Sequence, residues 1–302
     1  MSIQVQSVTK LYGEQKALDS VSFSIEQGEV VGFLGPNGAG KSTMMKIISC
    51  FLEPTSGDVL VGGQSVLNNS MEVRRIVGYL PENNPLYLEM YVKEYLGFVA
   101  GLYNISDTKK RVDEMIEMTG LGLEQGKKIG ALSKGYRQRV GIAQALIHDP
   151  KVLILDEPTS GLDPNQLNEI RNLIIEVGKE KTVMLSTHIM QEVESVCDRV
   201  IIIDRGILAA NQSVAEIQKG KSDEQVVVVE FDNSADVEDL KKIDGVDKVV
   251  AKTSTVFVFS SSQNKDIRPL VFQYAVDHKL SVLSMNQEKK SLEEVFKELT
   301  KS

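Results

Sequence analysis

The stretch Gly35-Pro36-Asn37-Gly38-Ala39-Gly40-Lys41-Ser42 decides the fold of this chain. The apolar run before it, residues 30–34, is typical of a strand, and the segment 41–52 after it has apolar residues at helical spacing. A strand, a glycine-rich turn and a helix in this order give the pattern G-x-x-x-x-G-K-[ST] the setting of a phosphate site. Glycines have no Cβ, so successive backbone N–H groups can curve around a polyphosphate, and the helix N-terminus adds partial positive charge.

The last two residues of this stretch carry side-chain chemistry. Lys41 can reach the β- and γ-phosphates of a nucleotide, and the Ser42 hydroxyl can ligate Mg²⁺. The four fixed positions of the pattern match by chance in about one unrelated chain in a hundred. On this stretch alone, a glycine-rich turn that binds nothing therefore stays open as the alternative.

The composition indicates a soluble globular protein. The 302 residues can form one large domain or a large and a small one. Hydrophobic residues make up 42% and charged residues 25%, no apolar run is long enough to span a membrane, and the N-terminus lacks a signal-peptide pattern. The formal net charge of −8 argues against broad nucleic-acid binding, which needs a basic surface.

Two cysteines and two of the histidines are interpreted as structural. Cys50 and Cys197 fall in predicted helices, and buried, reduced thiols at these positions fit a cytoplasmic location. His148 and His278 are likewise interpreted as structural residues.

The chain begins with two predicted strands. Residues 3–9 and 21–25 alternate apolar and polar side chains and are expected to form an antiparallel layer beside the phosphate site. Tyr12 lies between them, and its ring can either stack on a base or pack in the fold. From Val92 to about Leu123 apolar residues recur at helical spacing, which indicates a helical insert between strands of the core.

A second polar group is expected at the edge of the sheet. Residues 152–155 form a continuous apolar run, as in a central parallel strand that is covered on both faces. The run ends in Asp156 and Glu157, and carboxylates at the end of a buried strand are costly unless they serve a cation or a proton. The next strand, residues 182–186, delivers His188 to the same edge. From its position alone, His188 can be either a capping or a functional residue.

With these pieces placed, residues 1 to about 220 resemble the ATP-binding cassette (ABC) family, because its motifs occur in its order. The phosphate loop of the family matches Gly35–Ser42, and its Mg²⁺-and-base strand matches Val152–Glu157. Its signature stretch matches residues 132–139, its D-loop residues 160–163 and its switch histidine His188.

Two departures from the family pattern concern candidate site residues. The signature often reads Leu-Ser-Gly-Gly-Gln, whereas Lys134 and Tyr136 here replace a glycine and a glutamine. Ser133 and Gly135, whose hydroxyl and backbone N–H would meet a γ-phosphate, are kept. Glu82 stands where many members have a glutamine whose oxygen helps to ligate Mg²⁺, and a carboxylate is also an oxygen ligand.

The resemblance implies ATP hydrolysis with ATP and Mg²⁺ as cofactors. Glu157 would be the general base, with His188 and Lys41 as further catalytic residues. The implied Mg²⁺ ligands are Ser42, Glu82 and Asp156. The implied nucleotide contacts are Tyr12, Gly35, Pro36, Asn37, Gly38, Ala39, Gly40, Lys41, Ser42, Thr43, Ser133, Gly135 and Asp163.

The resemblance also implies partners. The signature segment would cover the ATP of a second copy, which predicts a head-to-tail homodimer. Membrane-spanning permease subunits would contact the insert near Glu82–Tyr103 and hold the chain at the cytoplasmic face of the membrane. Residues 77–102, the signature substitutions and Leu292–Phe296 resemble ABC-2 type exporters, in particular those associated with gliding motility. The alternatives are a soluble ABC ATPase acting on ribosomes or DNA, and a nucleotide-gated scaffold without turnover.

The expected fold is an α/β P-loop NTPase (RecA-like) cassette, residues 1–220, with a helical subdomain at about 85–150. Residues 221–302 are expected to form an accessory α+β domain, because their strands and helices follow the ferredoxin-like order β-α-β-β-α-β. A final helix is predicted from Ser291, with Glu294 completing a capping box. Its apolar stripe can dock on the chain itself or on a partner, and consists of Leu292, Val295, Phe296 and Leu299.

Overall fold

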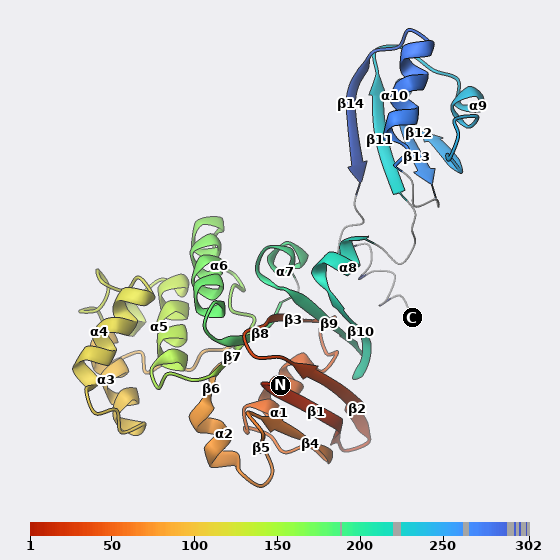
Figure 1. Ribbon diagram of the computed structural model, residues 1–302. Helices are drawn as coiled ribbons and strands as arrows, with labels where there is room; N and C mark the ends of the chain where they lie inside the picture. Colours follow the sequence, from red (N-terminus) through yellow and green to blue (C-terminus); the bar gives the residue numbers. More distant parts are fainter. Residues whose placement is uncertain are drawn as a thin grey trace. The chain divides into compact units, whose positions relative to one another are not determined.

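The computed structural model describes residues 1–187, 189–219, 225–261 and 266–288, together with Glu293, Phe296 and Thr300. The chain divides into two compact units, the first of which comprises Met1–Val214 and the second of which begins at Ala215 (Figure 1). In the described part of the chain, no helix has both the length and the apolar character that crossing a membrane requires.

A six-stranded sheet forms the centre of the first unit. Its order is β10-β9-β3-β8-β7-β6, and all neighbours are parallel except β10 and β9. Every residue of β3, β7 and β8 is buried, and for β7 this confirms the expectation of a strand covered on both faces. The strands span Val30–Leu34 (β3), Val77–Leu80 (β6), Val152–Asp156 (β7), Thr182–Ser186 (β8), Arg199–Asp204 (β9) and Ile207–Ser213 (β10).

The predicted antiparallel layer is also present. It has the order β2-β1-β4-β5, with β1 at Ile3–Tyr12, β2 at Gln15–Ile25, β4 at Ser56–Val61 and β5 at Gln64–Ser65. The helix α1, Lys41–Ile48, lies between this layer and the large sheet, because Met44 and Ile47 belong to the same buried cluster as Val59 of β4 and Phe33 of β3. The phosphate loop is thereby fixed between two sheets.

The end of α1 corrects the prediction of a helix through Leu52. Cys50 has a φ of 59°, and the N–H groups of Cys50 and Phe51 donate to Ile47 and Lys46 at 3.0 and 2.8 Å. This Schellman arrangement ends the helix and leaves Phe51 72% exposed. Cys197 is the C-terminal cap of α7, so neither cysteine lies inside a helix.

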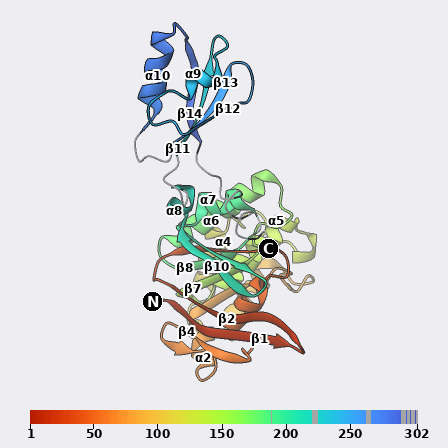
Figure 2. The same cartoon turned by 90° about the vertical axis from the view of Figure 1, so that its right-hand side faces the viewer.

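Helices fill the segment between β6 and β7, as predicted for the insert. They are α3 (Val92–Leu102), α4 (Thr108–Met118), the short 3₁₀ helix η1 (Ile129–Ala131) and α5 (Lys134–Leu146). On the face of the large sheet opposite α1 lie α6 (Pro164–Gly178) and α7 (Met190–Val196), as Figures 1 and 2 show. The sequence pattern did not predict α2 (Ser70–Ile76), which precedes β6.

The second unit contains the predicted order β-α-β-β-α-β after the short helix α8 (Val214–Lys219). Its antiparallel sheet has the order β12-β13-β11-β14, and Val271 and Ala275 of α10 join one buried cluster with its strands. The elements are β11 (Gln225–Phe231), α9 (Val237–Leu240), β12 (Lys248–Ala251), β13 (Val256–Ser261), α10 (Arg268–Asp277) and β14 (Val282–Glu288). The final helix predicted from Ser291 falls outside the described residues except at Glu293, Phe296 and Thr300.

Two glycines of the first unit should respond oppositely to the same substitution. A Cβ at Gly78 of β6 would overlap the carbonyl oxygen of Ala145, whereas a Cβ at Gly97 of α3 meets nothing within 4 Å. We expect Gly78→Ala to destabilise the chain by about 1–3 kcal/mol, because β6 and α5 must separate. Gly97→Ala should stabilise it by about 0.5–1 kcal/mol, because alanine loses less backbone entropy in a helix. Thermal unfolding of both variants checks this, and equal shifts would contradict it.

Candidate functional site

A cavity of about 500 Å³ lies at the phosphate loop, a volume within the usual range for ligand sites. Strands β6 and β7, whose carboxyl ends meet at this edge, lead into the two acidic residues of its lining, Glu82 and Glu157. Ala17 and Ser160 also line it, and no role was predicted for either. Its lining residues are Ala17, Asn37, Gly38, Gly40, Lys41, Ser42, Thr43, Glu82, Glu157 and Ser160.

The loop has a conformation that requires glycine at two positions. Gly40 has a φ of 109°, and a Cβ there would strike the carbonyl oxygen of Ala17. A Cβ at Gly35 would overlap the carbonyl oxygen of Ile203 in β9. The loop therefore packs closely against β2 at Ala17 and against β9 at Ile203. Its backbone N–H groups precede the N-terminus of α1, where an anion is stabilised.

Lys41 is folded back over this loop. Its side chain is buried, and Nζ donates to the carbonyl oxygens of Gly35 at 2.7 Å and Pro36 at 3.2 Å. These two neutral acceptors satisfy part of the ammonium group and can be exchanged for phosphate oxygens. Lys41 thus holds the two ends of the phosphate loop together through these hydrogen bonds, and the same ammonium group would contact a bound phosphate.

The charge around Lys41 is mainly negative. Burial lowers the pKa of Lys41, and the nearby carboxylates of Glu157, Asp156 and Glu82 oppose this shift. Three carboxylates facing one ammonium favour a further cation in the cavity. A polyphosphate alone would add negative charge, so the electrostatics favour a nucleotide that arrives with a divalent metal ion.

Asp156 and Glu157 are held by a residue that the sequence did not single out. Ser186, at the end of β8, donates from Oγ to Oδ1 of Asp156 at 2.6 Å and accepts the backbone N–H of Glu157 at 2.9 Å. Asp156 is 2% exposed, so this bond replaces water around a buried carboxylate. Glu157 has a φ of 52°, a strained conformation for a residue with a Cβ, and it turns the chain at the cavity.

These residues fit Mg²⁺ and a nucleotide. Mg²⁺ prefers oxygen ligands and commonly binds one or two carboxylates together with substrate phosphates. Ser42, Asp156 and Glu82 supply a hydroxyl and two carboxylates at this edge. Among the residues that the structure describes, no three His, Cys, Asp or Glu side chains form a metal cluster by themselves, so the phosphates would have to complete the ligand set.

Seven predicted nucleotide contacts do not line this cavity, three of them in the phosphate loop itself and four outside it. Tyr12 is 51% exposed, and the ammonium of Lys10 lies 5.6 Å from the centre of its ring. Ser133 caps α5 by accepting the N–H of Tyr136 at 3.4 Å, and Gly135 follows in the first turn. Asp163 caps α6. His188 lies outside the described residues, and Gly35, Pro36 and Ala39 complete the loop behind its lining residues.

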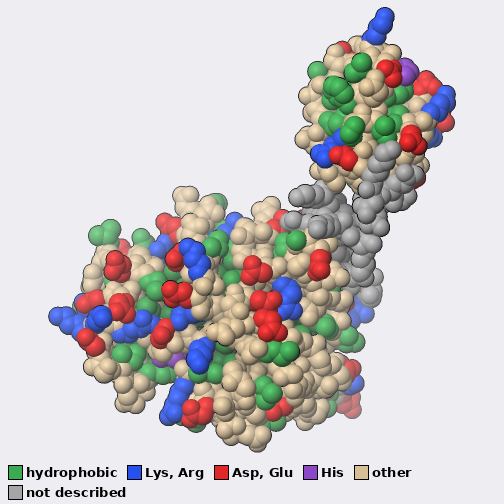
Figure 3. All heavy atoms as spheres, in the orientation of Figure 1, with side chains coloured by type: hydrophobic (Ala, Val, Ile, Leu, Met, Phe, Trp, Pro, Cys, Tyr) green, Lys and Arg blue, Asp and Glu red, His purple; other side chains and the backbone are tan. Residues whose placement is uncertain are grey.

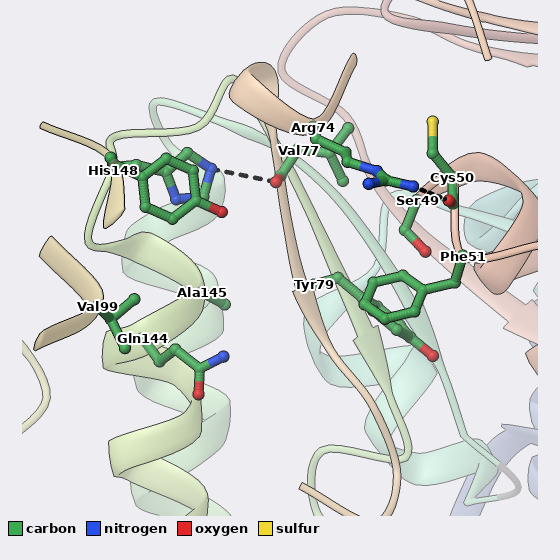
Figure 4. A pocket seen from close by; sticks show the side chains of 11 residues that line it. Ser49, Cys50, Phe51, Arg74, Val77, Tyr79, Val99, Gln144, Ala145 and His148 are labelled. Carbon is green, nitrogen blue, oxygen red and sulfur yellow. Dashed lines mark hydrogen bonds between the residues drawn. The ribbon is translucent and has the colours of Figure 1, made fainter. Parts of the chain in front are cut away.

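A second cavity, of about 340 Å³, lies between the helical insert and the large sheet. Figure 4 shows its two walls, with Val99, Gln144, Ala145 and His148 on one side and Ser49, Phe51, Arg74 and Tyr79 on the other. The remaining lining residues are Cys50, Val77 and Tyr103.

His148 is held in place within this second cavity. Its ring stacks on Tyr103 at 4.0 Å between centroids, and Nε2 lies 3.1 Å from the carbonyl oxygen of Val77. Burial lowers the pKa of His148, so the neutral ring is favoured. These contacts agree with the structural interpretation of this histidine.

The sheet order, the glycine loop and the buried acidic strand define the chain as a P-loop NTPase of the cassette type. The sequence model of the ABC transporter family matches residues 18–160. The uncharacterized ABC transporter ATP-binding protein YhcH of Bacillus subtilis is 35% identical over 309 residues, which cover 99% of this chain and 95% of the relative. The chain therefore belongs to the family of ABC transporter ATP-binding proteins.

Two further comparisons bear on transport and assembly. The bacitracin transport ATP-binding protein BcrA of Bacillus licheniformis is 34% identical over 308 residues, covering 98% of this chain and 96% of the relative. A dimeric ATP-binding cassette solved in a post-hydrolysis state with ADP and Pi has a TM-score of 0.65 and 29% identity, covering 70% of this chain and 98% of that chain.

Ser186 generates a prediction for this site. Ser186→Ala removes the donor to Asp156 and the acceptor for the Glu157 N–H, so we expect ATPase kcat/KM to fall at least about tenfold, as for a lost hydrogen bond to a charged group. Thr119→Ala is the control, because its buried hydroxyl donates to Met115 within α4, far along the chain from this site. Steady-state kinetics on both variants decide, and an equal loss in the two would contradict a role in the site.

Proposed function

We propose that this chain is the ATP-hydrolysing subunit of an ABC-2 type membrane exporter, powered by Mg-ATP-driven closure of a homodimer. The observation that carries the proposal is the cavity in which the phosphate loop and Lys41 face Glu157 and Glu82. Membership of the ABC transporter family supports ATP as the nucleotide, and the likeness to a bacitracin transport protein supports a role in transport.

Chemistry at a γ-phosphate consists mainly of positioning and charge neutralisation. Lys41 and the loop amides hold the phosphates, and Mg²⁺ supplies additional charge neutralisation. Ser42, Asp156 and Glu82 would hold that ion, Asp156 directly or through water. Glu157 polarises the attacking water as general base. His188 is assigned to keep the γ-phosphate and the water in line.

A second copy is required by this scheme. Ser133 and Gly135 carry the signature chemistry but do not line the cavity of their own chain. A head-to-tail dimer, supported by the dimeric cassette with ADP and Pi, would bring them over the nucleotide of the other copy. Asp163 would contribute at the same interface, and Tyr12 would stack on the adenine.

The second cavity is the proposed docking place for the membrane subunits. It joins the helical insert, through Val99 and Tyr103, to the phosphate-loop half of the unit, through Ser49 and Phe51. A permease segment seated there would respond when the two parts shift during closure. This contact would hold the chain at the cytoplasmic face of the membrane.

Two finer assignments are further proposals, and one alternative function is disfavoured. Gliding motility is a branch-level prediction, and the relatives reported above carry no motility name. The accessory role of the second unit is a proposal as well. Action on ribosomes or DNA is disfavoured by the net charge and by the face in Figure 3, where acidic and basic side chains alternate without a large basic patch.

The base assignment predicts the behaviour of Glu157→Gln. A carboxamide of the same size cannot accept the proton of water, so turnover should fall at least about 100-fold while Mg-ATP binding persists. With ATP and Mg²⁺ the variant should accumulate as a dimer, and light scattering after size-exclusion chromatography measures this. Glu180→Gln, at an exposed turn, is the matched control and should hydrolyse ATP normally. Normal ATPase activity in Glu157→Gln would remove the base assignment.

The docking proposal predicts a loss of membrane association. Phe51→Asp places a charge at an exposed position of the second cavity, so we expect the chain to co-purify less with its multi-span partner from solubilised membranes. Leu123→Asp is the control, because Leu123 is 92% exposed on the insert and does not line the cavity. Basal ATPase activity should be kept in both. Equal recovery of the partner with both variants, or co-sedimentation with ribosomes instead, would contradict the proposal.

A further inference from the structure

The N-termini of α5 and α6 touch through a side chain that has been given no role so far. Nε2 of Gln166, in the first turn of α6, lies 3.4 Å from Oγ of Ser133, the cap of α5. A Cβ at Gly135 would overlap the Gln166 side chain, including its amide oxygen. The carboxamide therefore covers both the hydroxyl and the glycine of the signature segment.

A second contact joins the same two segments. The ammonium of Lys134 lies so close to Gly161 that a Cβ there would collide with it. Gly161 has a φ of 69° and lies in the turn that connects β7 to α6. Lys134 replaces a glycine of the common signature, and a glycine at this position has no side chain that could reach Gly161.

We propose that Gln166 occupies, in the free chain, the place of the γ-phosphate of the ATP held by a second copy. Nε2 of Gln166 donates to Ser133 Oγ, and the carboxamide lies over Gly135, so it fills the space in which phosphate oxygens would accept from the Ser133 hydroxyl and the Gly135 N–H. Gln166 must withdraw before the dimer closes, and its contacts oppose closure until ATP replaces them. This inference rests on the proposed function, because only the dimer brings the second nucleotide to Ser133.

The surroundings of Gln166 let it withdraw without unfolding the helix. Its backbone N–H and that of Asn165 donate to Oδ1 of Asp163, both at 3.0 Å, which anchors the first turn of α6 independently of the side chain. The side chain itself is partly exposed and can turn toward solvent. In the proposed dimer, closure displaces one hydrogen bond between Gln166 and Ser133 in each of the two copies. The expected effect on the ATP concentration needed for closure is therefore modest.

The experiment uses the full chain in the Glu157→Gln background, and measures the ATP concentration that gives half-maximal dimer. Gln166→Ala should lower this concentration about threefold to tenfold, the factor that one hydrogen bond contributes. Gln166→Glu should raise it, because a carboxylate accepts the Ser133 hydroxyl and repels the γ-phosphate. Asn165→Ala, at the exposed neighbouring position, should leave it unchanged.

Opposite shifts in the alanine and glutamate variants support the inference, because a merely structural contact would be weakened in both. Shifts in the same direction, or no shift, would overturn it. Gln166→Glu is isosteric and keeps the test decisive even where the alanine variant is unstable. In the chain with Glu157 intact, Gln166→Ala should lower the KM for ATP and leave kcat unchanged. Absence of any ATP-dependent dimer in Glu157→Gln alone would count against the proposed function instead.

Discussion

The structure of the first unit depends on keeping the Asp156 carboxylate buried at the end of β7. Asp156 is 2% exposed and would be strongly destabilising without partners. Ser186 supplies one hydrogen bond from the neighbouring strand, and Lys41 supplies the nearby positive charge. Because Ser186 also holds the Glu157 N–H, the two strands fix both acidic residues with one hydroxyl. Ser186 and Lys41 thus stabilise the acidic residues of the site, and Mg²⁺ and phosphate would supply further partners.

The sequence predicted the elements whose patterns are local. The strand predicted at 152–155 is observed at Val152–Asp156, and the turn predicted before the first helix leads into α1 at Lys41, because a continuous apolar run and a glycine-rich turn each have few other solutions. The end of α1 was predicted wrongly, because Cys50 adopts a positive φ that its residue type does not announce. Ser186 was missed because a serine at the end of an apolar strand is common. Its role depends on hydrogen bonds to Glu157 and Asp156, which lie 29 and 30 positions earlier in the chain.

Only some of the predicted site residues meet in the cavity of the single chain. The loop residues, Glu82 and Glu157 meet in one cavity, as strand ends at one edge of a parallel sheet should. Ser133, Gly135 and Asp163 instead cap or begin helices and do not line it, and their roles as nucleotide contacts stay predictions that need a second copy. In the second unit, alternate residues of β11 are buried, namely Val227, Val229 and Phe231. This alternation made the strand predictable from the sequence, but a buried apolar pattern says nothing of the role of the unit.

In the proposed function, the absence of Ser133 and Gly135 from the cavity lining of their own chain determines how ATP binding could be coupled to association. If one chain held the whole site, ATP would stabilise that chain without favouring association. In the proposed dimer the groups that complete the site would belong to another copy. The free energy of ATP binding would then stabilise the dimer only through contacts that ATP makes in the dimer and not in the free chain. Gln166 sets part of that difference, because each signature segment must first give up a contact that it already has. Because Ser133 is already in contact with Gln166 in the free chain, closure requires a γ-phosphate that replaces this contact. When hydrolysis removes the γ-phosphate, Gln166 can contact Ser133 again, and this favours opening of the dimer.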